Sequence, residues 1–297
     1  MTDLSGTHSN HLKAGFIGLG SMGGPMARNV AKGSYLSAIW NRTEASAFVL
    51  ARELSVTPAV SPAVLAEQVD VVLMCVSADD DVLEVIHEML PGLRPGTVVI
   101  DHSTVSSDTA RAAAELVRSK GAEFLDAPVS GGVEGAKNGT LAMMIGGLAE
   151  SLDKVRPILQ CMALRIVHMG DVGTGQATKA VNQIMAAGIN QAVTEALAFA
   201  AAQGLHMDRV IEVVSGGAAG NWFLDQRGPT MIRGTFAPGF KLALHHKDLK
   251  ICKAMAEKLG ISLPVTEMTL NDYERLIHEG HGDEDISALY RLKRPKS

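Results

Sequence analysis

The segment AGFIGLGSMGG (residues 14–24) decides which fold the first half of the chain can adopt. Its apolar start is typical of a buried β-strand. The glycines at 18, 20 and 23 then form the pattern GxGxxG, which binds the pyrophosphate of a dinucleotide when it joins a strand to a helix. Gly18 permits the tight turn, Gly20 lets the pyrophosphate approach the backbone, and Gly23 lets the helix pack against the strand.

We therefore predict that the phosphates of a dinucleotide lie at the N-terminus of a helix that begins near Met22. The predicted cofactor-binding residues of this turn are Gly18, Leu19, Gly20, Ser21, Met22 and Gly23. The alternative is an ordinary glycine-rich turn that binds no ligand.

Short apolar runs alternate with helical spacing through the first half of the chain, which predicts an α/β fold with a doubly wound, mostly parallel sheet. The runs cover residues 14–19, 37–40, 70–76, 97–101, 123–127, 141–147 and 165–170. After Gly175 the strand pattern stops, and helices are predicted at 176–204, 207–215, around 222–232, 244–260 and 264–280. We divide the chain into a loose N-terminal arm (1–13), a dinucleotide-binding domain (14–173) and an all-helical domain (174–297), joined by the first long helix.

The composition excludes several classes of protein. Of the 297 residues, 46% are hydrophobic and 20% are charged, so the chain can bury a large core. A net charge of −5 without a basic block argues against a nucleic-acid surface. Three scattered cysteines, no metal-binding spacing, no signal peptide and no membrane-spanning run predict a cytoplasmic protein without a metal or a membrane partner. We expect His8 and His11, and the basic tail at 291–297, to be solvated and without function.

The residues after the second apolar run bear on which dinucleotide binds. An acidic residue at this point hydrogen-bonds the adenosine ribose and selects NAD. This chain has Asn41, Arg42 and Thr43 instead, and a guanidinium suits a 2′-phosphate. The pattern predicts NADP(H) over NAD(H), with NAD(H) still possible. The alternative is that Arg42 is an ordinary surface residue and Thr43 is the N-cap of a helix.

Two further strand ends and one loop are candidates for ligand contacts at the carboxyl edge of the sheet. We expect Val76, Ser77 and Thr104 to flank the cofactor, and His102 to be structural. The loop at Ser130, Gly131 and Gly132 offers a hydroxyl and uncrowded backbone amides, which suit a substrate carboxylate. An equally open alternative is a flexible loop without a ligand.

Lys179, Asn182 and Gln183 have the spacing i, i+3, i+4, so they lie on one face of the predicted joining helix. A lysine whose pKa is lowered by burial can donate a proton to a carbonyl oxygen and stabilise a developing alkoxide. The alternative is an exposed lysine without a catalytic role.

Five motifs in order resemble those of the β-hydroxyacid dehydrogenase family, which includes 3-hydroxyisobutyrate dehydrogenases and semialdehyde reductases. They are GFIGLGSMGGPMARN (15–29), DHST (101–104), DAPVSGGVEGAKNGTLAMMIGG (126–147), GTGQATKAVNQ (173–183) and HHKDLKI (245–251). The resemblance implies a Rossmann domain followed by a helical substrate and oligomerisation domain, in a homodimer or homotetramer.

The resemblance also implies roles for individual residues. Lys179 becomes the catalytic acid/base, while Ser130, Gly131, Gly132, Asn182 and Asp248 become substrate ligands or their support. The implied cofactor contacts are Val76, Thr104, Phe240 and Lys247, in addition to the glycine turn. The NRT at 41–43 is similar to that of NADPH-using semialdehyde reductases and differs from the aspartate more common in 3-hydroxyisobutyrate dehydrogenases.

These features predict an NADP(H)-dependent enzyme that interconverts a small carboxylate-bearing semialdehyde and its hydroxy acid by hydride transfer. An NAD-dependent 3-hydroxyisobutyrate dehydrogenase is one alternative. A non-catalytic nucleotide-binding relative and an imine reductase are others, although Lys179 speaks against both because such relatives commonly replace that lysine.

Overall fold

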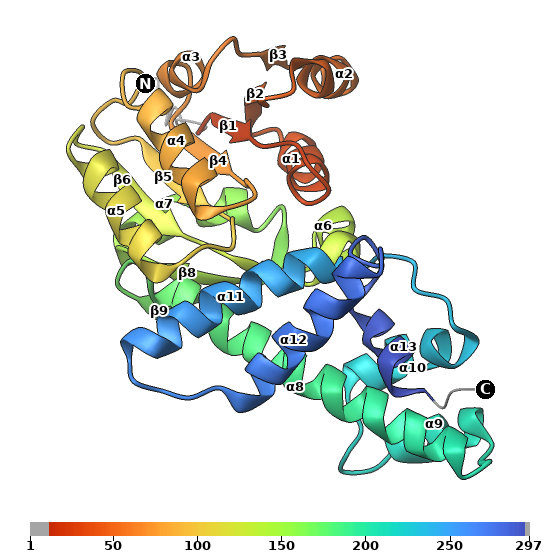
Figure 1. Ribbon diagram of the computed structural model, residues 1–297. Helices are drawn as coiled ribbons and strands as arrows, with labels where there is room; N and C mark the ends of the chain where they lie inside the picture. Colours follow the sequence, from red (N-terminus) through yellow and green to blue (C-terminus); the bar gives the residue numbers. More distant parts are fainter. Residues whose placement is uncertain (1–11, 295–297) are drawn as a thin grey trace, which may run out of the picture. The chain divides into compact units, whose positions relative to one another are not determined.

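The computed structural model describes residues 12–294 (Figure 1). The predicted N-terminal arm, including His8 and His11, lies outside the described residues except for Leu12 and Lys13. The chain divides into two compact units between Gln176 and Ala177.

The first unit is built on one twisted sheet whose strand order confirms the predicted doubly wound α/β fold. The strands are β1 (Ala14–Ile17), β2 (Leu36–Trp40), β3 (Thr57–Pro58), β4 (Val71–Met74), β5 (Val98–Asp101), β6 (Glu123–Asp126), β7 (Val129–Ser130), β8 (Leu141–Gly146) and β9 (Ala163–Gly170). Their order is β3-β2-β1-β4-β5-β6-β8-β7, and β9 pairs with β8. The six neighbouring strands β3, β2, β1, β4, β5 and β6 are parallel, whereas β8 is antiparallel to both β6 and β7.

Helices cover both faces of this sheet (Figure 1). They are α1 (Gly23–Lys32), α2 (Glu44–Leu54), α3 (Pro62–Glu67), α4 (Asp79–Met89), α5 (Ser107–Arg118), α6 (Gly132–Asn138) and α7 (Ala149–Leu159). Side chains from α1, α2 and α7 form one buried apolar cluster with one face of the sheet. Side chains from α3, α4 and α5 form a second cluster on the other face. The alternating sides of a pleated strand explain this division, since neighbouring Phe16 and Ile17 enter different clusters.

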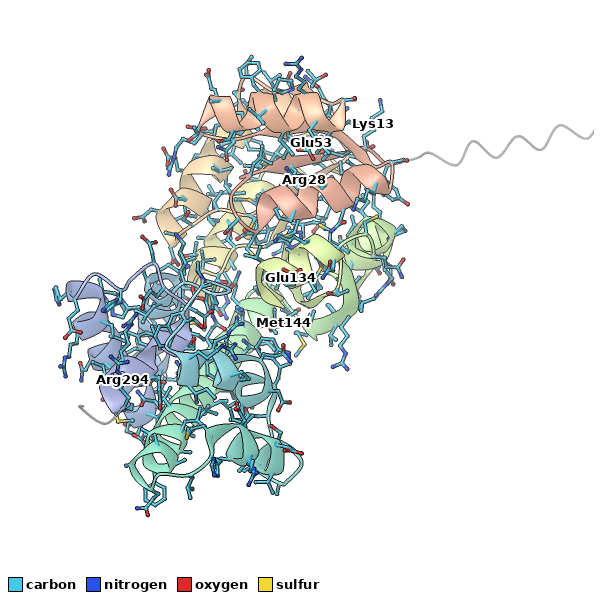
Figure 2. All side chains as sticks on the ribbon, turned by 90° about the vertical axis from the view of Figure 1, so that its right-hand side faces the viewer. Lys13, Arg28, Glu53, Glu134, Met144 and Arg294 are labelled. Carbon is cyan, nitrogen blue, oxygen red and sulfur yellow. The ribbon has the colours of Figure 1, made fainter. Side chains whose placement is uncertain are left out.

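An ion pair joins the first two helices. The Arg28 guanidinium donates two hydrogen bonds to the Glu53 carboxylate, at 2.7 and 2.8 Å, and Figure 2 shows both side chains between α1 and α2. The hydrogen bond lowers the pKa of Glu53 and raises that of Arg28. The pair ties the helix that follows the glycine turn to the helix that follows Thr43.

The second unit is helical, as predicted. Its elements are α8 (Thr174–Ala202, which begins in the first unit), α9 (Met207–Ser215), α10 (Trp222–Arg233), α11 (Leu242–Lys258), α12 (Pro264–His278), a 3₁₀ turn η1 (Ile286–Leu289) and α13 (Tyr290–Lys293). Leu197, Leu249, Tyr273 and other buried side chains from these helices form a single apolar cluster.

Helix α8 is long and apolar enough, by length and composition alone, to cross a membrane. Core helices of other proteins pass the same test. On α8, Asn190, Gln191 and Thr194 are buried. Asn190 donates to the Tyr273 hydroxyl at 2.9 Å and Gln191 donates to Asp272 at 2.9 Å, so this polar face is hydrogen-bonded to α12. We therefore interpret α8 as the central helix of the helical unit.

The expectation of a solvated tail was wrong for residues 291–293, which form α13. Arg291 makes two hydrogen bonds of 2.8 Å with Glu284, and its guanidinium lies 4.6 Å from the centre of the Phe236 ring. Lys293 lies 3.2 Å from Asp272. Acidic partners from earlier in the chain hold this basic segment against the unit. Residues 295–297 of the predicted tail lie outside the described residues.

Candidate active site

The glycine turn between β1 and α1 has the shape that a bound pyrophosphate requires. Gly18 has a φ of +85°, and a side chain there would collide with the carbonyl oxygen of Cys75. A side chain at Gly23 would collide with the carbonyl oxygen of Gly18. At Gly20, by contrast, an added Cβ would meet nothing within 4 Å. The turn is therefore packed at its two ends and open at its middle, which fits a ligand that approaches the backbone at Gly20.

Asn41, which directly follows β2, is hydrogen-bonded to this turn. Its side-chain oxygen accepts a hydrogen bond from the Leu19 amide at 2.9 Å, and its side-chain nitrogen donates to the Thr43 carbonyl at 3.1 Å. Thr43 stands at the N-cap of α2, but its side chain makes no capping hydrogen bond. The Asn41 side chain thus links the glycine turn to the segment that carries the acidic residue in an NAD site.

A pocket of about 280 Å³ lies beside the turn. Its lining includes the predicted cofactor residues Gly18, Gly20, Asn41, Arg42, Thr43, Val76 and Ser77, together with Trp40, Cys75, Asp81, Glu84, Val85 and Glu88. Leu19, Ser21, Met22, Gly23 and Thr104 lie in the same unit but outside this lining. The pocket therefore joins the glycine turn to the NRT segment and to the ends of β2 and β4, as a dinucleotide site requires.

Arg42 forms ion pairs with two carboxylates that also line this pocket. Its Nη1 atom lies 2.8 Å from Asp81 Oδ1 and 3.8 Å from Glu84 Oε2, both on α4. The side chain is still 72% exposed. Sequence reasoning identified the guanidinium but not its acidic partners.

The ends of β4 and β5 are linked by hydrogen bonds. The Val76 amide donates to Ser103 Oγ at 2.8 Å. His102 is buried, its Nδ1 lies 2.9 Å from the Ala127 carbonyl, and burial lowers its pKa to about 4. A neutral imidazole bonded to the backbone in this way fits the structural role that we expected.

The predicted carboxylate loop follows β7. Ser130 ends this strand, and Gly131 and Gly132 have φ angles of +131° and +62°, which favour glycine. Gly131 is the N-cap of α6 and, as a glycine, contributes no side-chain capping hydrogen bond. The residues predicted to contact a carboxylate therefore lie at the end of β7 and the start of α6.

Two residues that sequence reasoning did not single out anchor the start of α8 to the sheet. Buried Asp126 accepts hydrogen bonds from the amides of Gly173 and Gln176, each at 2.8 Å, and burial raises its pKa. The Gln176 side chain donates to the Ser103 carbonyl at 2.8 Å and accepts from the Val105 amide at 3.2 Å. Both residues lie in the motifs quoted above, but the contact between them spans 50 positions.

The second unit brings the predicted polar face of α8 together with the KDL segment of α11. Lys179 is only 7% exposed. Burial lowers its pKa, while nearby Asp248 raises it and Lys247 lowers it. Asp248 is also buried; it accepts from Gln183 at 2.6 Å and lies 3.0 Å from Lys247 Nζ. Asn182 donates to the Gln183 side chain at 2.8 Å.

His245 supports this cluster and was not predicted. Its Nε2 lies 3.2 Å from the Gln183 carbonyl, which can only accept, so Nε2 carries the proton. Its Nδ1, 3.1 Å from the Tyr273 hydroxyl, then accepts a hydrogen bond. Burial lowers the pKa of His245 to about 4, so the ring is neutral near pH 7. Phe240, a predicted cofactor contact, packs with its ring centre 5.3 Å from that of His245.

Comparison with known proteins identifies the family. Residues 13–170 match the family model of the NAD-binding domain of 6-phosphogluconate dehydrogenase. Residues 173–293 match the model described as NAD-binding of NADP-dependent 3-hydroxyisobutyrate dehydrogenase. The chain belongs to the β-hydroxyacid dehydrogenase family. It is therefore an NAD(P)-dependent oxidoreductase.

Relatives within the β-hydroxyacid dehydrogenases match almost the whole chain. An uncharacterized oxidoreductase from Shewanella frigidimarina is 38% identical, covering 96% of this chain and 99% of the relative. The 2-hydroxy-3-oxopropionate reductase of Escherichia coli is 36% identical, covering 94% and 96% respectively. The solved structure of 3-hydroxyisobutyrate dehydrogenase from Mycobacterium tuberculosis with L-serine is 32% identical, with a TM-score of 0.89 over 96% of this chain and 99% of that one.

Proposed function

We propose that this β-hydroxyacid dehydrogenase reduces small semialdehydes that carry a carboxylate, such as glyoxylate or succinic semialdehyde, and prefers NADP(H). In the reverse direction it would oxidise the corresponding hydroxy acid. The observation that carries the proposal is a lysine that is 7% exposed beside a hydrogen-bonded carboxylate, in a chain that also has an open dinucleotide turn. We assign the cofactor pyrophosphate to the glycine turn and the adenosine ribose to the segment from Asn41 to Thr43.

The cofactor supplies one part of the chemistry, which is a hydride for the carbonyl carbon. In our proposal the protein supplies the proton. Lys179, as an ammonium, donates it to the carbonyl oxygen as negative charge develops there. A buried amine gives up its proton more readily than an exposed lysine, because burial lowers its pKa.

Neighbouring residues keep Lys179 able to act. Asp248 raises the pKa of Lys179 and offsets part of the effect of burial, so the amine can still be protonated. Gln183 and Lys247 hold the Asp248 carboxylate from both oxygens. We propose that Asn182 orients the substrate by hydrogen bonding, and that Ser130, Gly131 and Gly132 bind its carboxylate through a hydroxyl and backbone amides. Phe240, Thr104 and Lys247 remain proposed cofactor contacts.

A substrate panel with both cofactors tests this proposal. The panel contains glyoxylate, succinic semialdehyde, tartronate semialdehyde and methylmalonate semialdehyde, and NADPH or NADH oxidation is followed by absorbance. Butyraldehyde is the matched control for succinic semialdehyde, because it has the same chain length without the carboxylate. We expect kcat/KM to be higher with NADPH than with NADH. We expect it to be at least tenfold lower for butyraldehyde than for succinic semialdehyde, since a lost charged hydrogen bond removes about 1.5–3 kcal/mol.

An NAD-dependent 3-hydroxyisobutyrate dehydrogenase is the second candidate. Two observations favour it. One is the similarity to the Mycobacterium tuberculosis enzyme, and the other is that carboxylates of this chain already form ion pairs with Arg42. Activity confined to 3-hydroxyisobutyrate with NAD⁺ would select it over our proposal. Tight binding of NADPH without turnover on any member of the panel would contradict both and point to a nucleotide-binding module.

We also propose a cytoplasmic homodimer or homotetramer without nucleic-acid or membrane partners. In the part of the chain that the structure describes, Cys75, Cys161 and Cys252 form no disulfide. Exposed apolar side chains gather near the end of α11 and along α12, including Leu259, Ile261, Val265 and Met268. Light scattering coupled to size exclusion measures the mass, and a monomer at micromolar concentration would contradict this part of the proposal.

A further inference from the structure

We propose that Asp81 competes with the 2′-phosphate of NADP(H) for the guanidinium of Arg42, and so determines how strongly the protein prefers NADP(H) over NAD(H). This inference rests on the proposed nucleotide site. It concerns a carboxylate that lies 39 residues from Arg42 in sequence, on a different element of the same unit.

Helix α4 has an acidic face. Asp81, Glu84 and Glu88 are spaced by three and four residues, so they lie on one side of the helix. All three line the pocket that also contains Arg42, Asn41 and the glycine turn. One wall of the proposed adenosine site is therefore negatively charged.

The geometry places the strongest of these interactions at Asp81. Its carboxylate lies 2.8 Å from Arg42 Nη1, within hydrogen-bond distance, whereas Glu84 lies 3.8 Å away. The Asp81 side chain is 22% exposed and that of Glu84 is 59% exposed. The closer and more buried carboxylate is the stronger competitor, because it is less screened by water.

The two cofactors place different demands on this pair. A 2′-phosphate carries up to two negative charges and needs a cationic partner, so it must draw Arg42 away from Asp81 and also approach the acidic wall. A ribose 2′-hydroxyl carries no charge and leaves the ion pair intact. The pair therefore weakens binding of the phosphorylated cofactor selectively.

Paired adenosine fragments isolate this effect from catalysis. Adenosine 2′,5′-bisphosphate and adenosine 5′-monophosphate differ only in the 2′-phosphate, and their Kd values can be measured by calorimetry. We expect Asp81→Asn to tighten binding of the bisphosphate by about threefold to tenfold, the range for loss of one partly exposed ion pair together with its repulsion of the ligand. The Kd of the monophosphate should change by less than about twofold.

Asp80→Asn is the matched control. Asp80 stands in the same first turn of α4 and carries the same charge, but it is exposed and is not part of the pocket lining. It should leave both Kd values unchanged. Glu84→Gln is a second variant, expected to act in the same direction as Asp81→Asn but more weakly. A thermal melt of each variant verifies the fold.

A variant series on an Arg42→Ala background distinguishes competition from general repulsion. Without the guanidinium, Asp81→Asn should lose most of its effect. Three outcomes would overturn the inference without contradicting the proposed nucleotide site. They are an equal gain in bisphosphate affinity from Asp81→Asn on both backgrounds, an equal gain from Asp80→Asn, and no gain from either Asp81→Asn or Glu84→Gln. If the wild-type protein binds neither fragment nor NADPH, the proposed nucleotide site itself is wrong, and the inference is overturned with it.

Discussion

Replacing Lys179 with methionine separates the proposed chemistry from the packing of the site. Methionine keeps an unbranched side chain of similar length, so the apolar contacts of the lysine stem remain and little cavity forms. The ammonium, which is the proposed proton donor, is removed. General acid catalysis contributes about 10²–10⁴ in rate, which corresponds to about 2.7–5.4 kcal/mol of barrier at 1.36 kcal/mol per tenfold. We expect kcat for reduction to fall by at least about 10².

The same substitution should not destabilise the fold. Lys179 is 7% exposed, and its buried charge is unfavourable by desolvation. After the substitution Asp248 still accepts from Gln183 at 2.6 Å and still lies 3.0 Å from Lys247, so it does not become an unpaired buried charge. We therefore expect the free energy of unfolding to stay the same or to rise by up to about 2 kcal/mol.

Three measurements complete this test. Turnover is followed by NADPH absorbance, cofactor affinity by NADPH fluorescence, and unfolding by urea titration. We expect slow turnover with unchanged cofactor affinity and an equal or higher urea midpoint. Turnover within threefold of the wild type would refute the catalytic role, and a loss of stability above about 3 kcal/mol would identify Lys179 as a structural ion-pair partner.

Further predictions concern proton transfer, the glycine turn and the support of the cluster. Because burial lowers the pKa of Lys179 below its usual 10.5, reduction, which needs the ammonium, should lose rate as the pH rises through that lowered pKa, and oxidation should gain over the same range. Asp248→Asn removes an interaction that raises this pKa, so the alkaline limb in the kcat/KM profile for reduction should move to lower pH; an unmoved limb would contradict the coupling. Gly20→Ala should leave the melting temperature unchanged, because the added Cβ meets nothing within 4 Å. It should raise the Kd for NADPH at least about tenfold, because the methyl group blocks the approach of the pyrophosphate. An unchanged affinity would place the phosphates elsewhere. His245→Phe removes the ring's hydrogen bonds to both the Gln183 carbonyl and the Tyr273 hydroxyl, so it should lower the free energy of unfolding by about 2–4 kcal/mol; an unchanged urea midpoint would deny that His245 supports α8.

Much of the fold could be predicted because its signals are local. The buried strand, the glycine turn and the start of α1 lie within consecutive residues, and a parallel strand buried on both faces is recognisable as a short apolar run. The strands β3 and β7 were missed because each has only two residues, too few for a pattern. The short final helix was missed because Arg291 pairs with Glu284 and stacks on Phe236, which pattern alone does not pair.

The candidate site was predictable where residues share one helix face, and not where it depends on distant partners. Spacing along α8 placed Lys179, Asn182 and Gln183 together, but it could not identify His245 as their support. Similarly, the NRT segment pointed to Arg42 as a phosphate ligand, while its partner Asp81 lies 39 residues away. Tertiary contacts of this range are set by how whole elements pack, and a single helical or strand period does not encode them.

We propose that this protein transfers a hydride to a carboxylate-bearing semialdehyde with Lys179 as the proton donor. An isotope experiment follows both transfers. The protein is mixed with succinic semialdehyde or glyoxylate and with NADPH that carries deuterium at both positions of nicotinamide C4, and the mass of the hydroxy acid product is measured by mass spectrometry. We expect a product heavier by one mass unit with the wild-type protein, and almost no product in the same time with Lys179→Met. Unlabelled product, or equal labelled product from both proteins, would contradict it.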